Sequence, residues 1–192
     1  QLIARRVREL NVYCEIHPYN NIPALTPEIK GVILSGSPCS VTQNDAPVPN
    51  LNSLIKNIPI LGICYGAQFL VKHFGGVVES SKTREYGRAN LSFFNSENSL
   101  FENIQSNSQV WMSHGDTIKS LAKNMIKLAS TNDVENAAFQ ISNENIFGIQ
   151  FHPEVFHSTD GLQIIKNFVV NISKCSTDWC LYGKKQEKCN KL

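Results

Sequence analysis

Two short, unbroken apolar runs most constrain how this chain folds: GVILS at 31–35 and IPILGI at 58–63. Such runs are typical of parallel strands that are buried on both faces. A helical pattern opens the chain at 2–10, and another follows the second run and stops at Gly75 and Gly76, a pair suited to a C-terminal cap. This alternation predicts an α/β domain with an open, mostly parallel central sheet flanked by helices.

The second half of the chain contains more strand patterns than helical ones. Short segments with β-branched or aromatic residues are separated by Asn-rich turns. A final helical stripe with one apolar face predicts a helix from about 160 to 172. The predicted strands lie at 12–16, 88–94, 109–113, 125–130, 137–142 and 146–151, and a short helix is predicted at 51–57.

Length and charge exclude several classes of protein. A chain of 192 residues with 42% hydrophobic residues is large enough for one compact domain with its own core. A formal net charge of +2 gives no basis for binding a nucleic acid. No apolar run approaches the roughly 20 residues that cross a bilayer, and the charged N-terminal segment does not resemble a secretory signal. We therefore expect a cytoplasmic protein without a nucleic-acid or membrane partner.

Of the six cysteines, Cys14, Cys39 and Cys64 are expected to be free thiols. Cys14 and Cys39 lie in or beside strand-like segments of a chain that is large enough to fold without disulfides. Cys175, Cys180 and Cys189 cluster near the C-terminus without a nearby histidine, and their spacing matches neither common zinc pattern. No metal site is predicted.

Cys64 lies in the segment GICYG at 62–66, between a predicted buried strand and a predicted helix. The two glycines allow a sharp turn and close packing, so the cysteine side chain projects from the end of the strand. The N-terminus of the following helix favours the negative charge of a thiolate, and the N–H of Tyr65 faces any oxyanion formed by attack. The pattern predicts a nucleophile, whereas Cys14 and Cys39 are interpreted as structural.

A cysteine nucleophile needs a base, and the base needs an orienting group. His152 ends a predicted strand in the segment FHPE, and Pro153 keeps the chain extended, so that Glu154 points to the same side. His114 also follows a predicted strand, but it lies among small and polar residues that are better suited to holding a substrate. The residues favour His152 as the base, with His114 as the alternative.

Together these segments resemble the class I, triad-type glutamine amidotransferases. GICYGAQ and FHPE are shared across that family, whereas VILSGSP, REYGRA, VWMSHGDTI and GIQFHPEVFHS are similar to its GMP synthetase branch. The resemblance covers residues 1 to about 179. It implies an amidotransferase domain at 1–173, followed by a C-terminal tail or truncated linker at 174–192, since the last residues are polar and basic with no periodicity.

The resemblance implies a glutaminase that works through a cysteine thioester. Cys64 is expected to attack the side-chain amide of L-glutamine, and His152 to protonate the departing ammonia. Water then releases glutamate, while Glu154 orients His152 and stabilises its charge.

The resemblance also implies where glutamine binds. Backbone N–H groups of Tyr65, Gly36 and Ser37 are expected to hold the oxyanion. The residues that resemble the glutamine-binding elements of the family are Gln68, Ser113, His114 and Asp116. The carboxylate of Asp116 suits the α-ammonium group of the substrate.

This chain departs from the family pattern at three places. Ser37 replaces a second glycine, at a cost on the order of 1 kcal/mol if the position needs a positive φ. The first strand of the family is absent before 2–10, which predicts an N-terminal truncation. Residues 181–192 do not continue into an ATP-pyrophosphatase domain, so no cofactor is expected in this chain. ATP and magnesium belong to a synthetase domain or subunit that uses the ammonia to convert XMP into GMP.

Two other interpretations stay open. The chain could serve another synthase, such as one that makes anthranilate or carbamoyl phosphate, although VWMSHGD and EVFHS argue against this. It could also be a non-catalytic, truncated fragment. Intact Cys64, His152 and Glu154 argue against a loss of chemistry, whereas the absent first strand argues for a loss of stability.

Overall fold

The computed structural model describes residues 1–52 and 54–180, and its centre is a seven-stranded sheet in the order β1-β2-β7-β6-β5-β3-β4. The strands are β1 (Val32–Leu34), β2 (Ile60–Ile63), β3 (Val77–Phe94), β4 (Gln109–Ser120), β5 (Met125–Thr131), β6 (Ala138–Ile141) and β7 (Ile146–Ile149). The helices are α1 (Leu2–Glu9), α2 (Tyr65–His73), the short η1 (Ser99–Phe101), α3 (Gly161–Lys166) and the π-helical η2 (Asn167–Ile172).

The sheet is mixed, which corrects the predicted mostly parallel arrangement. β1 pairs with β2 and β2 with β7 in parallel, whereas the pairs β7–β6, β6–β5, β5–β3 and β3–β4 are antiparallel. Parallel neighbours need a long crossover, but the later strands follow one another through short turns such as 142–145, which allow only antiparallel pairing. The absence of a first strand stays a prediction.

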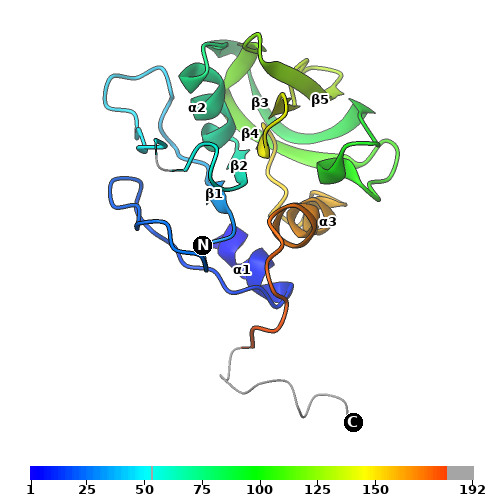
Figure 1. Ribbon diagram of the computed structural model, residues 1–192. Helices are drawn as coiled ribbons and strands as arrows, with labels where there is room; N and C mark the ends of the chain where they lie inside the picture. Colours follow the sequence, from blue (N-terminus) through cyan, green and yellow to red (C-terminus); the bar gives the residue numbers. More distant parts are fainter. Residues whose placement is uncertain (53, 181–192) are drawn as a thin grey trace.

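β3 joins β4 to the rest of the sheet. Its first part, 77–90, pairs with β4, and its last part, 91–94, pairs with β5. One long strand therefore belongs to two neighbouring ladders, and the antiparallel part curls away from β1 and β2 (Figure 1). As a result, the inward face of β4 lies over the end of β2 and the start of α2.

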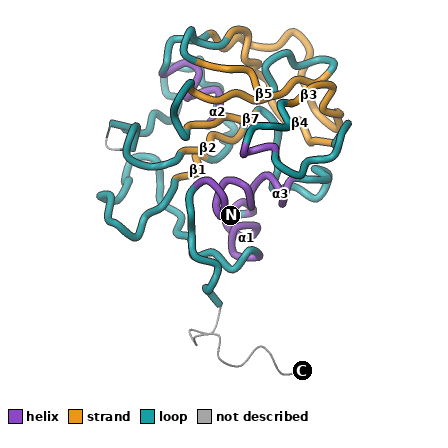
Figure 2. The backbone as a smooth tube through the Cα atoms, turned by 45° about the vertical axis from the view of Figure 1, so that its right-hand side comes forward, coloured by secondary structure: helices purple, strands orange, loops and turns teal. Residues whose placement is uncertain are grey.

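Helices cover the parallel part of the sheet on both faces, as predicted. α2 lies on one face, where its Phe69 packs with Ile60 of β2. α1 and α3 lie side by side away from α2 (Figures 1 and 2), and Ile164 packs with Leu61 and Phe147 in a second core. Alternate residues of β2 thus enter different cores, as the two-residue period of a strand requires. None of the helices in the described chain is long and apolar enough to cross a membrane.

Several predicted elements have different bounds in the structure. The helices at the start of the chain and after Cys64 are confirmed. After α2 ends at His73, Gly75 has a φ of 90°, and the N–H of Gly76 donates to the carbonyl of Val71. The predicted strand at 12–16 is wrong, because these residues have no regular secondary structure, and the described residues of 51–57 form turns. A strand requires a ladder partner, which local periodicity cannot supply.

The predicted final helix is confirmed, but its second half is π-helical around Asn167. The Asn167 side chain is fully buried, and its Nδ2 donates to the carbonyls of Leu100 at 3.0 Å and Glu102 at 2.8 Å. Its Oδ1 accepts bonds from the side chains of Gln163 and Asn171. One amide therefore joins the last helix to the turn that precedes β4.

We expect Asn167→Ala to lower the free energy of unfolding by about 2–5 kcal/mol, because two carbonyls would lose their donor inside the protein. Asn171→Ala, which removes one partner of Asn167 at a half-buried position, should cost less than about 1 kcal/mol. Urea denaturation of both variants measures the difference. Equal losses would show that the buried amide has no special role.

Candidate active site

Cys64 occupies a strained turn between β2 and α2. Its φ is 52° and its ψ is −106°, a conformation that costs about 1–3 kcal/mol in a residue other than glycine. Its N–H donates to the carbonyl of Ile149 at 2.8 Å and so continues the ladder between β2 and β7. The side chain is 5% exposed, and Sγ lies 3.7 Å from the carbonyl oxygen of Ser113.

The two glycines of GICYG lie where neighbouring backbone atoms leave no room for a side chain. A Cβ at Gly62 would lie 2.6 Å from the carbonyl carbon of Gly66. A Cβ at Gly66 would overlap the carbonyl group of Leu34 in β1. The start of α2 therefore packs directly on the strands, and the sharp turn predicted from these glycines is present in the structure.

His152 lies close to Cys64 and is bonded to Glu154. Its Nδ1 is 2.8 Å from Oε1 of Glu154, and the Glu154 side chain is largely buried. Because Nδ1 is used in this way, Nε2 is the ring nitrogen that remains for Cys64. The three side chains thus follow one another in the order Cys64, His152, Glu154.

The environment keeps His152 protonated. Burial alone lowers the pKa of His152, but the hydrogen bonds and charges of Cys64 and Glu154 outweigh it and raise that pKa to about 10. His114 behaves in the opposite way: burial, assisted by the charge of His152, lowers its pKa to about 4. At neutral pH the site therefore contains one imidazolium and one neutral imidazole.

Three residues that the sequence did not single out hold the backbone around His152. The N–H of His152 donates to the carbonyl of Trp111 at 2.9 Å, and the hydroxyl of Ser158 donates to the carbonyl of His152 at 2.6 Å. Nε of Arg6, on α1, donates to the carbonyl of Glu154 at 2.9 Å. Arg6 lies 148 positions away in sequence, so no local pattern indicates this contact.

The loop after β1 lies against the same side chains. A Cβ at Gly36 would be 3.2 Å from Cε1 of His152 and 3.7 Å from Cβ of Cys64. Neither Gly36 nor Ser37 is among the residues with positive φ in the described chain, so the backbone cost anticipated at Ser37 does not arise. The Ser37 hydroxyl instead accepts a bond from the N–H of Cys39 at 3.2 Å. Tyr65, which follows Cys64, is the first residue of α2.

The four predicted glutamine-binding residues lie near Cys64, on α2 and β4. β4 continues to Ser120, beyond the predicted end at 113, because its inward positions stay buried as far as Ile118. His114 and Asp116 therefore lie inside the strand and not in a turn after it. Nε2 of Gln68 donates to the carbonyl of Asp116 at 2.8 Å, which joins α2 to β4.

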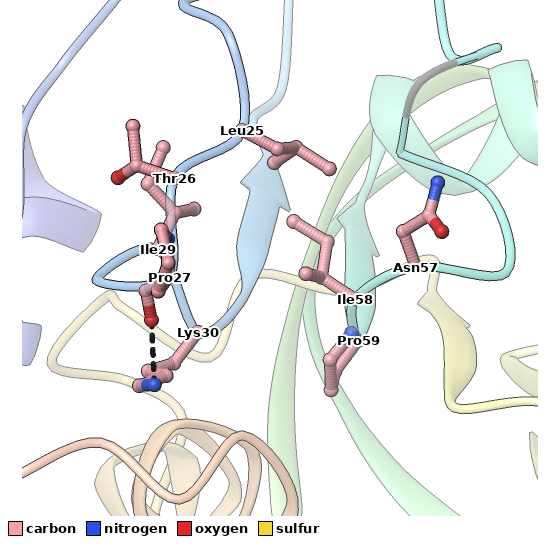
Figure 3. A pocket seen from close by; sticks show the side chains of 8 residues that line it. All are labelled: Leu25, Thr26, Pro27, Ile29, Lys30, Asn57, Ile58 and Pro59. Carbon is pink, nitrogen blue, oxygen red and sulfur yellow. Dashed lines mark hydrogen bonds between the residues drawn. The ribbon is translucent and has the colours of Figure 1, made fainter.

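One surface hollow of the described chain lies elsewhere. It has a volume of about 690 Å³ and lies between the segments that lead into β1 and β2, as Figure 3 shows. Leu25 and Ile58 line it, and its one cation, Lys30, donates to the carbonyl of Pro27 at 2.6 Å. It lies at the opposite ends of these strands from Cys64 and contains no acid–base pair, so it is not the candidate site.

The described part of the chain contains no group of three or more His, Cys, Asp or Glu side chains that could hold a metal ion. Cys14, Cys39 and Cys64 are free thiols there, as predicted. Cys175 is a free thiol too, whereas Cys189 lies outside the described residues. The candidate site brings together a thiol, two imidazoles, two carboxylates and backbone N–H groups.

Cys64→Ala should lower the pKa of His152 well below 10, because it removes the thiol hydrogen bond and the charge that oppose burial. NMR titration of the His152 ring in both proteins measures this. An unchanged His152 pKa would contradict the proposed contact with Cys64.

Comparison with known proteins gives a consistent result. The family model described as glutamine amidotransferase class-I matches residues 1–172. GMP synthase (glutamine-hydrolyzing) of Christiangramia forsetii is 57% identical over 179 residues, which are 93% of this chain and 35% of that protein. The protein of the same name from Phocaeicola vulgatus is 58% identical over the same shares. The chain thus spans about a third of the length of these curated relatives.

A solved structure has the same fold. It is a Thermoplasma acidophilum protein described as one subunit of a GMP synthase, and it matches with a TM-score of 0.76 and 32% identity. The match covers 91% of this chain and 87% of that one. Sequence, fold and the family model agree over almost the whole described chain. The chain belongs to the class-I glutamine amidotransferase family.

Proposed function

We propose that this chain is the glutaminase part of a GMP synthase. It hydrolyses L-glutamine to glutamate and ammonia, and a synthetase domain or subunit uses the ammonia to convert XMP into GMP. The observation that carries the proposal is the connected arrangement of Cys64, protonated His152 and Glu154 at the end of β2. The relatives named above support the choice of GMP synthase within the family.

The first half of the reaction forms a thioester. The Cys64 thiolate adds to the side-chain carbonyl carbon of glutamine, and negative charge develops on the carbonyl oxygen. When the carbon–nitrogen bond breaks, the proton on Nε2 of His152 passes to the nitrogen and ammonia leaves. Glu154 keeps Nδ1 bonded throughout, so the ring donates from the nitrogen that faces Cys64.

The second half returns the enzyme to its starting state. Neutral His152 takes a proton from water, and the water oxygen adds to the thioester carbonyl. The carbon–sulfur bond then breaks, which releases glutamate and restores the thiolate beside protonated His152. Backbone N–H groups of Tyr65 and of the Gly36–Ser37 loop stabilise the oxyanion in both halves, since both lie next to Cys64.

The polar side chains of β4 and α2 bind the rest of glutamine. We assign the α-ammonium group to the carboxylate of Asp116, while Gln68, Ser113 and His114 line the same space. The lowered pKa of His114 supports this role, because a neutral imidazole adds no positive charge beside His152. It also makes His114 a poor carrier of the reacting proton at neutral pH.

The synthetase partner completes the activity. The curated relatives are about three times as long as the matched region, so we propose that the synthetase portion is either joined to this region or carried on its own chain. ATP and magnesium are expected at that portion, and no cofactor in the described chain. A purine-synthesis enzyme of this kind is expected in the cytoplasm.

Glutamate release from L-glutamine tests the proposal. The purified chain is assayed alone and with an added GMP synthetase pyrophosphatase domain that is supplied with ATP, magnesium and XMP, beside a Cys64→Ala control. We expect release above the control, and a further increase when the supplied partner is present. A folded chain that never exceeds the control would overturn the glutaminase; release that ignores the partner would overturn only the GMP synthase assignment.

The pH dependence of the glutaminase follows from His152. The ring must be protonated to release ammonia, and its raised pKa keeps it protonated up to about pH 10. We therefore expect kcat/KM to hold through mildly alkaline pH and to fall above about pH 10. Glu154→Gln removes a charge that raises this pKa, so the fall should begin at lower pH. Circular dichroism at each pH separates this titration from unfolding, and an unshifted profile would contradict the role of Glu154.

A further inference from the structure

Two polar side chains interrupt the inward face of β4. The inward positions are Val110, Met112, His114, Asp116 and Ile118, all of which are buried. Apolar residues thus flank a histidine and an aspartate that are 4% and 8% exposed. Burying a carboxylate in this way is unfavourable unless other groups bond to it. The groups that bond to Asp116 therefore indicate how its position is fixed.

Asp116 is held from two other elements. The Ser40 hydroxyl donates to Oδ2 of the Asp116 carboxylate, and Gln68 on α2 bonds its main-chain carbonyl. The carboxylate and the backbone are thus fixed separately. Ser40 lies 76 positions before Asp116 in sequence, and only the fold brings the two together.

The loop that carries Ser40 also fixes the direction of its hydroxyl. The N–H of Thr42 donates to Oγ of Ser40 at 3.2 Å, and the two hydroxyl oxygens are 2.7 Å apart. The single hydroxyl hydrogen of Ser40 goes to Asp116, so Thr42 must donate in the second contact as well. The N–H of Ser40 bonds to Oε1 of Gln43 at 3.2 Å, which holds the turn closed.

We propose that Ser40 is a positioning residue for substrate recognition, which orients the Asp116 carboxylate toward the α-ammonium group of glutamine. The inference rests on the proposed function. Ser40 lies four positions after Gly36, whose loop faces Cys64 and His152. One loop therefore serves both ends of the substrate: its start lies at the reacting amide, and Ser40 acts through Asp116 on the α-carbon end.

The proposed role of Ser40 predicts different effects on KM and on kcat. The α-ammonium group is remote from the reacting amide, so its contact is the same in the ground state and in the transition state. Loss of such a contact raises KM and leaves kcat unchanged. Glutaramate is a substrate analogue without the α-ammonium group, so the loss of this contact should not change how tightly it binds.

The experiment measures kcat and KM for L-glutamine, and the inhibition constant of glutaramate, in the full chain with its synthetase partner. For Ser40→Ala we expect KM to rise about 5- to 20-fold, less than for a lost bond to a charged group because the Asp116 carboxylate is still present, with kcat within about twofold. The inhibition constant of glutaramate should change by less than about twofold. Ser40→Thr, which keeps the hydroxyl, should restore KM.

Two controls separate this role from a general effect on folding. Thr42→Val removes a donor to Ser40 but keeps the Ser40–Asp116 bond, so it should raise KM less than Ser40→Ala does. Alkylation of Cys64 by iodoacetamide should proceed at the wild-type rate in every variant if the β2–α2 turn is intact. If Ser40→Ala does not fold, Ser40→Gly tests the same loss.

Every result decides the proposal. A rise in KM for L-glutamine alone, reversed by threonine, supports it. Equal rises for L-glutamine and glutaramate, a fall in kcat alone, or no change overturns it while the glutaminase stands. Wild-type protein that releases no glutamate above Cys64→Ala overturns the proposed function, and this inference with it.

Discussion

The close packing of α2 on the ends of β1 and β2 is the constraint on which the rest of the site depends. Gly62 and Gly66 leave no room for a side chain where the helix meets the strands. Because the helix begins so close to the strands, Cys64 has a positive φ where the chain enters α2. The bond from its N–H to the carbonyl of Ile149 helps to hold this conformation. The position of the thiol is therefore set by backbone packing, and everything that acts on it must approach from the loops around it.

The charges of the site depend on that placement. An imidazolium that is largely buried is stable only when partners compensate for its lost hydration, and His152 has two, Cys64 and Glu154. The positions of His152 and Glu154 are maintained through their main chain. Trp111 and Ser158 bond the N–H and the carbonyl of His152, and Arg6 bonds the carbonyl of Glu154. Positioning of this kind uses no ring nitrogen of His152, so Nδ1 can bond Glu154 while Nε2 stays available for chemistry.

The sequence predicted the site better than the sheet. GICYG and FHPE are local patterns in which five or fewer residues determine the geometry, and the structure has the strand–turn–helix around Cys64 and the short bond from His152 to Glu154. The apolar runs indicated buried strands, but burial does not determine the direction in which strands pair, so the mixed sheet was missed. The length of β4 was missed as well, because His114 and Asp116 are polar residues at inward positions.

The sequence by itself determined the strand–turn–helix around Cys64, the closeness of His152 to Glu154, and the flanking of the sheet by helices, because each follows from the spacing of neighbouring residues. The tertiary structure decided which distant groups serve them. Arg6 reaches Glu154 from α1, and Ser40 reaches Asp116 from the loop after β1. These contacts join residues 148 and 76 positions apart, and such a distance in sequence leaves no periodic signal. Only the packing of the curled sheet against its helices brings them within hydrogen-bond distance.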